Sequence, residues 1–229
     1  FGPKSREMMS KISKDDFTNK SFSFGNSKFI TIENIKVWAQ RLSYVGELGY
    51  ELYIDKQNAK KIYTIITKEG NNFKLSHCGM HAMDIMRMES GFVHWGHDIS
   101  PEENQYEAGL KFAISYKKNI NFIGKEALIK IKDKNLNKRF MMLVLKNNKP
   151  GEPLLLHDEP IYLDDKIIGV TTSGNFSFNY NKNLSFGYIK SDLSNDELFR
   201  ENLYIEIEKN KYSAEILLKP LKQTDFKNL

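Results

Sequence analysis

Residues 78–98 combine a predicted helix with a loop that is dense in side chains able to bind a ligand or transfer a proton. The first half of this stretch predicts a helix, and Gly91 is expected just beyond its end, because that position often needs a positive φ. The next loop brings together two imidazoles, an indole and a carboxylate: His94, Trp95, His97 and Asp98. Loops that extend from a helix end often carry function, so this loop is a candidate site.

A zinc site is the first chemistry that this stretch suggests. Cys78 and His81, followed by His94 and His97, resemble the ligand spacing of a zinc module. We expect no metal site, because such spacings match often by chance and His81 lies inside the predicted helix, which ties its direction to the helix face. An activated thiol beside His77 or His81 is the alternative. No signature of a cysteine hydrolase surrounds Cys78, so we expect a buried structural thiol.

A second candidate is the turn Val45-Gly-Glu-Leu-Gly49, which Tyr44 and Glu51 flank. An aromatic ring and a carboxylate at two strand ends could hold a flat, nitrogen-rich ring, by stacking and by hydrogen bonds to its N–H groups. The pattern fits equally a plain hairpin with Tyr44 in the core and Glu51 in solvent. Arg87, on a mostly apolar helix, is either part of a buried ion pair or a contact for an anionic ligand tail.

Composition excludes several classes of function. The 229 residues include 34 basic and 29 acidic side chains without a basic block, so we expect no nucleic-acid partner. No apolar run approaches the roughly 18 residues of a membrane span, so we expect no membrane partner. One cysteine fits a reducing compartment, which predicts a cytoplasmic protein. The segment Gly169-Val-Thr-Thr-Ser-Gly174 lacks the lysine and helix of a phosphate-binding loop, and we exclude that function.

Two regions with different periodicity must position these residues. Residues 1–135 mix helical patterns (2–12, 55–70, 79–90 and from 124) with strand patterns (29–33, 36–44, 50–54 and 107–115). Residues 136–229 alternate with period two, in strands 139–145 and 185–189 and in hairpins turning at Asp164-Asp165 and Lys209-Asn210. Such hairpins predict a small antiparallel barrel or sandwich. We therefore predict an α+β chain with domains 1–135 and 136–229.

Six motifs, taken together and in order, resemble one known family. They are Gly2-Pro-Lys-Ser-Arg6, Ser43-Tyr-Val-Gly-Glu-Leu-Gly-Tyr-Glu-Leu52, Asp84-Ile-Met-Arg-Met-Glu-Ser-Gly91, Glu107-Ala-Gly-Leu110, Phe122-Ile-Gly-Lys-Glu-Ala-Leu128 and Ile168-Gly-Val-Thr-Thr-Ser-Gly174. This succession resembles the aminomethyltransferase family, which comprises the glycine cleavage T-protein and its relatives, over essentially the whole chain. The sequence His94-Trp-Gly-His-Asp-Ile99 looks most like the C-terminal, folate-binding module of dimethylglycine and sarcosine dehydrogenases.

The resemblance implies an incomplete cloverleaf folate-binding module followed by a C-terminal antiparallel β-barrel. It implies that a tetrahydrofolate pterin is held by Glu51 with Tyr44 beside it, that Arg87 lies toward the folate tail, and that Trp95 lines the pocket. The implied function is one-carbon transfer to folate, giving methylene-tetrahydrofolate, from a small-molecule substrate (a methylated glycine or an aminomethyl donor). The enzyme would contribute mainly orientation and proton transfer.

The chain also departs from the family pattern. The family's catalytic aspartate precedes the Gly-Pro-Lys helix, upstream of residue 1, so the catalytic residue stays unknown. We expect the N-terminal part of the module to be missing, with FAD only in a missing N-terminal domain of the same full-length chain. The fragment alone is expected to bind folate weakly and to turn nothing over. The alternatives are a stand-alone T-protein-like aminomethyltransferase and a non-enzymatic folate-binding protein of the same fold.

Overall fold

A computed structural model describes residues 1–118, 120–134, 136, 138–146, 149–223, 225 and 227–228. The chain divides into two compact units, Phe1–Ser90 with Lys222–Leu229 and Gly91–Leu221. Each unit is described by itself. The sequence-based boundary at 135/136 concerns domains of the family type and stays a prediction. None of the described helices is long and apolar enough to cross a membrane.

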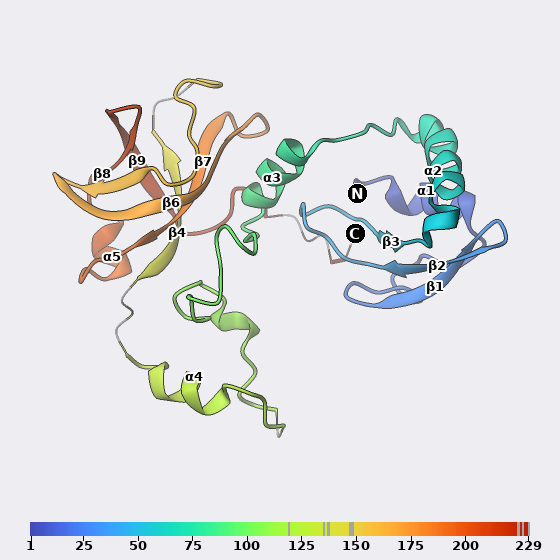
Figure 1. Cartoon of the computed structure of the whole chain (residues 1–229), viewed down its shortest axis with the longest axis horizontal. Helices are drawn as coiled ribbons and strands as arrows, with labels where there is room; N and C mark the ends of the chain where they lie inside the picture. The colour runs from blue at the N-terminus through green and yellow to red at the C-terminus, as the bar shows by residue number, and fades with distance from the viewer. Residues whose placement is uncertain are drawn as a thin grey trace. The chain divides into compact units, whose positions relative to one another are not determined.

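The first unit is built on a three-stranded antiparallel sheet in the order β1-β2-β3. Its strands are β1 (Ser27–Ile32), β2 (Ile35–Gln40) and β3 (Glu51–Tyr53). Its helices are α1 (Ser5–Ile12), α2 (Lys56–Gly70), the short 3-10 helix η1 (Asn71–Phe73) and α3 (Met80–Glu89). Figure 1 shows α1 and α2 on one side of this sheet. They bury alternate strand residues there, in a core that includes Met9, Ile30, Val37, Ala39 and Ile62.

The second unit contains a closed antiparallel barrel with the strand order β4-β7-β6-β5-β8-β9 (Figure 1). Its strands are β4 (Arg139–Leu145), β5 (Pro160–Leu163), β6 (Lys166–Ser177), β7 (Lys182–Ile189), β8 (Leu203–Ile207) and β9 (Asn210–Leu217). Three short helices accompany them: η2 (Lys111–Ala113), α4 (Lys125–Ile131) and α5 (Asn195–Leu198). Closure leaves no strand edge in the ring, and the inward side chains form one apolar core that includes Leu143, Ile161, Ile189 and Ile205.

The structure confirms the α+β class and the C-terminal barrel, and it corrects two local predictions. Residues 107–115 were expected to form a strand, but they form turns and η2. Local hydrogen bonds explain this, since the Ala108 and Leu110 N–H groups donate to the carbonyls of Asn104 and Gln105 at 3.0 and 2.8 Å. The strand expected over 36–44 ends at Gln40, and an irregular segment follows.

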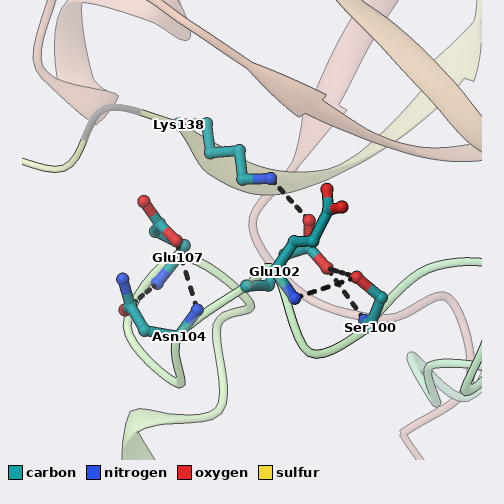
Figure 2. A network of polar contacts seen from close by, with 6 residues as sticks. Ser100, Glu102, Asn104, Glu107 and Lys138 are labelled. Carbon is teal, nitrogen blue, oxygen red and sulfur yellow. Dashed lines mark hydrogen bonds and ion pairs between the residues drawn. The ribbon is translucent and has the colours of Figure 1, made fainter.

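A polar network fixes the segment 100–107 in the second unit (Figure 2). The Glu103 carboxylate accepts hydrogen bonds from the backbone N–H and Oγ of Ser100 at 2.8 and 2.7 Å, and from Nζ of Lys138 at 2.5 Å. Asn104 and Glu107 bond each other reciprocally, because each backbone N–H donates to the other side chain, at 3.2 and 3.1 Å. The segment is thereby tied to Lys138, which immediately precedes β4.

Glu103→Gln is expected to flatten the acid side of the stability profile. Burial raises the pKa of Glu103, but hydrogen bonds from Lys138 and Ser100 outweigh burial and hold this pKa below its ordinary value. Such a group stabilises the fold above its unfolded pKa, and that contribution is lost as the pH falls through its folded pKa. Urea unfolding at several pH values below about 5 should therefore show a smaller loss of stability in Glu103→Gln than in wild type. The exposed neighbour Glu102, changed to Gln, is the control, and parallel profiles for all three proteins would contradict the assignment.

Candidate functional site

The turn between β2 and β3 packs closely against the end of α3. Its backbone folds back because the Glu47 N–H donates to Oγ of Ser43 at 2.9 Å, and Gly46 adopts φ +64°. A Cβ atom on Gly46 would lie 2.3 Å from Oγ of Ser90, the residue that follows α3. Glycine is required here both by the positive φ and by this close approach.

Three further contacts anchor the same turn. The Leu48 carbonyl accepts hydrogen bonds from the Gly2 N–H at 2.8 Å and from Oγ of Ser5 at 3.0 Å. Lys222 forms an ion pair with Glu47, and its backbone N–H donates to the Glu89 carbonyl at 2.8 Å. Glu47 therefore takes part in the contacts that hold the turn. Tyr44 and Glu51, the two flanking residues identified from the sequence, lie just before and just after the turn.

Those two flanking residues, Tyr44 and Glu51, are half-buried. Glu51 is the first residue of β3 and lies opposite Gln40 of β2. Its Oε2 accepts a hydrogen bond from the Tyr53 hydroxyl at 3.3 Å, and its negative charge, followed by this hydrogen bond, raises the pKa of Tyr53. Glu51 is thus neither fully solvated nor ion-paired among the described residues, so its carboxylate could accept further hydrogen bonds.

Arg87 lies in the last turn of α3 and is 1% exposed. Its guanidinium donates to Oδ1 of Asp84, at 2.8 Å from Nε and 2.7 Å from a terminal nitrogen. A cation near a helix C-terminus also interacts favourably with the helix dipole. This geometry fits the interpretation of Arg87 as part of a buried ion pair. Its contact with a ligand tail stays a prediction.

Trp95 belongs to the second unit, and its side chain is 65% exposed. The loop that carries it is held by Asp98, which is 1% exposed and accepts three hydrogen bonds. The donors are Oγ1 of Thr172 at 2.6 Å, Oγ of Ser173 at 2.7 Å and the backbone N–H of His94 at 2.8 Å. A buried carboxylate that accepts hydrogen bonds from three donors has a fixed orientation. Asp98 therefore holds the loop against β6, and the Trp95 indole stays exposed to solvent.

The role of Asp98 was missed by sequence reasoning. Its partners Thr172 and Ser173 lie in the segment that the sequence excluded as a phosphate loop, at a register shift in the pairing of β6 with β7. The signal was present, since the acid of the loop 94–99 and the Thr-Thr-Ser run both lie in motifs that carry the family resemblance. Residue spacing alone does not connect them, because 74 residues separate Asp98 from Thr172.

The zinc-like spacing is divided between the two units, with Cys78 and His81 in the first and His94 and His97 in the second. Among the residues that the structure describes, no group of three or more potential ligands could hold a metal ion. Cys78 is exposed, so the expectation of a buried thiol was wrong. Nε2 of His77 instead lies 2.9 Å from the Tyr63 hydroxyl, on α2.

Two family models match the chain. The model described as the GCVT N-terminal domain matches residues 1–118, and the model described as the glycine cleavage T-protein C-terminal barrel domain matches residues 138–222. The second match contains all six strands of the barrel. The two matches together follow the order of elements in the structure.

Known proteins of this family are similar to the chain over nearly its full length. Human mitochondrial dimethylglycine dehydrogenase is 33% identical over 224 residues, which are 98% of this chain and 25% of that protein. An aminomethyltransferase of Listeria welshimeri is 34% identical over 219 residues, 96% of this chain and 57% of that protein. The chain thus spans between a quarter and about six tenths of the length of these relatives.

A solved structure shows the same fold. The glycine cleavage system aminomethyltransferase T from Bartonella henselae superposes with a TM-score of 0.78 at 18% identity, covering 95% of this chain and 56% of that one. The two family models confirm the family that the ordered motifs predicted, and the sequence comparison confirms the similarity to dimethylglycine dehydrogenase. The chain belongs to the aminomethyltransferase family of the glycine cleavage T-protein.

Proposed function

We propose that the chain is the tetrahydrofolate-binding, one-carbon-transferring module of a dimethylglycine or sarcosine dehydrogenase-like oxidative demethylase. Family membership and the similarity to dimethylglycine dehydrogenase support this proposal. Its partner would be a small methylated amine, and a flavin domain elsewhere in the full-length chain would oxidise it. Within this proposal, residues 1–135 belong to the folate module and residues 136–229 form its barrel domain.

The observation that carries the proposal is the state of Glu51. A half-buried carboxylate at a strand end, with only the Tyr53 hydroxyl bonded to it among described residues, retains acceptor capacity. The pterin of tetrahydrofolate presents neighbouring N–H donors in one plane, which is the geometry that a carboxylate accepts. The residues present therefore fit this group. Glu51 would hold the ring and Tyr44 would lie beside it, whereas the folate-binding roles of Arg87 and Trp95 rest on the family resemblance.

When bound, tetrahydrofolate supplies the nucleophilic nitrogen that takes up the one-carbon unit. The residues of this chain would orient that ring and restrict water around it, which is the larger part of such catalysis. No acid of the chain is assigned as the proton-transferring group. The whole enzyme's turnover therefore depends on more than the residues named here.

A stand-alone aminomethyltransferase is the second candidate. The Listeria welshimeri relative favours it, because it is 34% identical to this chain against 33% for the dehydrogenase, while the chain covers 57% of its length rather than 25%. The sequence encoded upstream separates the two candidates. A Gly-x-Gly-x-x-Gly flavin fingerprint there would support the demethylase, whereas a start about 130 residues upstream would support the aminomethyltransferase.

Glu51→Ala is expected to weaken tetrahydrofolate binding by about tenfold, because hydrogen bonds from the ring to a charged acceptor are lost. Isothermal titration calorimetry with tetrahydrofolate, kept reduced in anaerobic buffer, measures the change in Kd. Glu33→Ala removes a half-exposed acid of the same unit, in the β1–β2 turn, and should leave Kd within twofold of wild type. Equal Kd values for wild type and Glu51→Ala would remove Glu51 from the site, and no binding by wild type would overturn the proposed function.

A further inference from the structure

The three-stranded sheet of the first unit has one open face. Residues of one parity are buried in a common core with residues of α1 and α2, and residues of the other parity point to the opposite face. On the open face, Phe29, Trp38 and Tyr53 lie directly opposite one another on the three strands. Phe29 and Tyr53 are 53% and 54% exposed, so this aromatic row faces solvent although its neighbours in the chain are core residues.

The adjacent row on the same face contains Gln40 opposite Glu51. Both side chains are half-buried. The Gln40 amide makes no hydrogen bond with any described residue, and Glu51 accepts one, from Tyr53. Two hydrogen-bonding groups with free capacity therefore lie beside two aromatic rings, on the sheet face opposite the core that α1 and α2 share with the strands.

The dimensions of this patch fit a small fused ring. Cross-strand neighbours have Cβ atoms roughly 5 Å apart, and alternate residues of one strand lie roughly 7 Å apart. Gln40, Glu51, Trp38 and Tyr53 thus occupy the corners of an area of about 5 by 7 Å, close to the size of a two-ring heterocycle. The patch ends at Phe29, because Nζ of Lys36 lies over that ring, 4.0 Å from its centroid.

We propose that this face is the ring-binding surface of the folate site, in which Gln40 bonds the pterin edge beside Glu51 and the rings of Trp38 and Tyr53 pack against the pterin. This inference rests on the proposed function and adds three residues to it. The carboxylate selects a ring with N–H donors, and the amide adds one donor and one acceptor next to it. A purely apolar partner would bury the Glu51 carboxylate with no donor beyond the Tyr53 hydroxyl, which is costly.

Gln40→Ala and Tyr53→Leu should each weaken tetrahydrofolate binding by about five- to tenfold, through a lost hydrogen bond and lost stacking respectively. Gln57→Ala and Tyr63→Leu are the matched controls. Both residues are exposed on α2 of the same unit, and Tyr63 is 55% exposed, as Tyr53 is. The controls should leave Kd within twofold of wild type. Thermal melting of each variant verifies folding before titration.

The two tryptophans of the chain, Trp38 and Trp95, provide an independent readout. Their indole N–H signals in a ¹⁵N–¹H spectrum are assigned with Trp38→Phe and Trp95→Phe. The probe 6-methyltetrahydropterin, which carries the ring without the tail, should shift the Trp38 signal. If wild type binds tetrahydrofolate while Trp38 stays unshifted and Gln40→Ala keeps its affinity, the sheet face is the wrong place and the proposed function stands. If wild type binds neither compound, both proposals are overturned.

Discussion

Replacement of Asp98 by alanine is expected to lower the free energy of unfolding of the protein by about 4 kcal/mol. The substitution removes the acceptor of these three hydrogen bonds, so that the half-buried hydroxyl of Thr172 and the buried hydroxyl of Ser173 lose their acceptor. Hydrogen bonds to a charged group contribute about 1.5–3 kcal/mol each, and they are not additive in one network. Equilibrium unfolding in urea, followed by circular dichroism, measures the loss.

Two further variants separate the hydrogen bonds of Asp98 from its charge. Asp98→Asn keeps one acceptor oxygen and should lose less stability than Asp98→Ala. Asp158→Ala removes an acid of the same unit that is 83% exposed and pairs with His157, and it should change stability by less than about 0.5 kcal/mol. If Asp98→Ala is as stable as Asp158→Ala, the loop is not held by Asp98.

Asp98→Ala also tests whether the hydrogen bonds of Asp98 hold the loop that carries the Trp95 indole. Trp95 lies in a loop that Asp98 links to β6, because its carboxylate accepts hydrogen bonds from Thr172 and Ser173. Without them, the loop 94–99 should open locally at a lower free energy than the barrel unfolds. Limited proteolysis should then cut Asp98→Ala near Trp95 before the barrel strands, at a denaturant concentration that leaves the wild-type loop intact.

The barrel was predictable from sequence because its signals are local. Alternation of apolar residues gives the strand faces, and polar residues at Asp164-Asp165 and Lys209-Asn210 mark the turns. The structure has positive φ at Asp164, in the first predicted turn, as a tight hairpin turn requires. The second turn lies one residue earlier than predicted, at Glu208-Lys209, where both residues have positive φ, and Asn210 is the first residue of β9. The strand expected at 107–115 failed for the opposite reason. Its apolar residues alternate, but side-chain and backbone hydrogen bonds around Asn104 hold the segment in turns.

The candidate site was predictable only in part. The glycine-flanked turn pointed to Tyr44 and Glu51, since two glycines around an acid are a strong local signal. Gln40 carried no such signal, because its position opposite Glu51 depends on where β2 ends and on the register between β2 and β3. Because the strand was expected to continue to Tyr44, the pairing of Gln40 with Glu51 was not predicted. Pairings that depend on long-range register need the structure.

Gly46→Ala is expected to lower the free energy of unfolding by about 3 kcal/mol and to weaken folate binding. A positive φ costs a non-glycine residue about 1 kcal/mol, and crowding in a packed place adds 1–3 kcal/mol. At Gly46 both apply, because the new Cβ would lie 2.3 Å from Oγ of Ser90. Tyr44 and Glu51 flank the turn that contains Gly46. A displacement of this turn would therefore move both residues proposed to contact the pterin ring. Urea unfolding and calorimetry with tetrahydrofolate measure the two effects.

Gly25 offers a control that isolates the backbone term. It has φ +83°, and a Cβ atom there would meet nothing within 4 Å, so Gly25→Ala should cost only about 1 kcal/mol and leave folate affinity unchanged. Combining Gly46→Ala with Ser90→Gly removes the crowding atom and should restore part of the stability, as a double-mutant cycle would reveal. If Gly46→Ala and Gly25→Ala lose equal free energies of unfolding, the turn does not pack closely against the end of α3. The turn could then shift without cost, and it would be too loose to position Glu51.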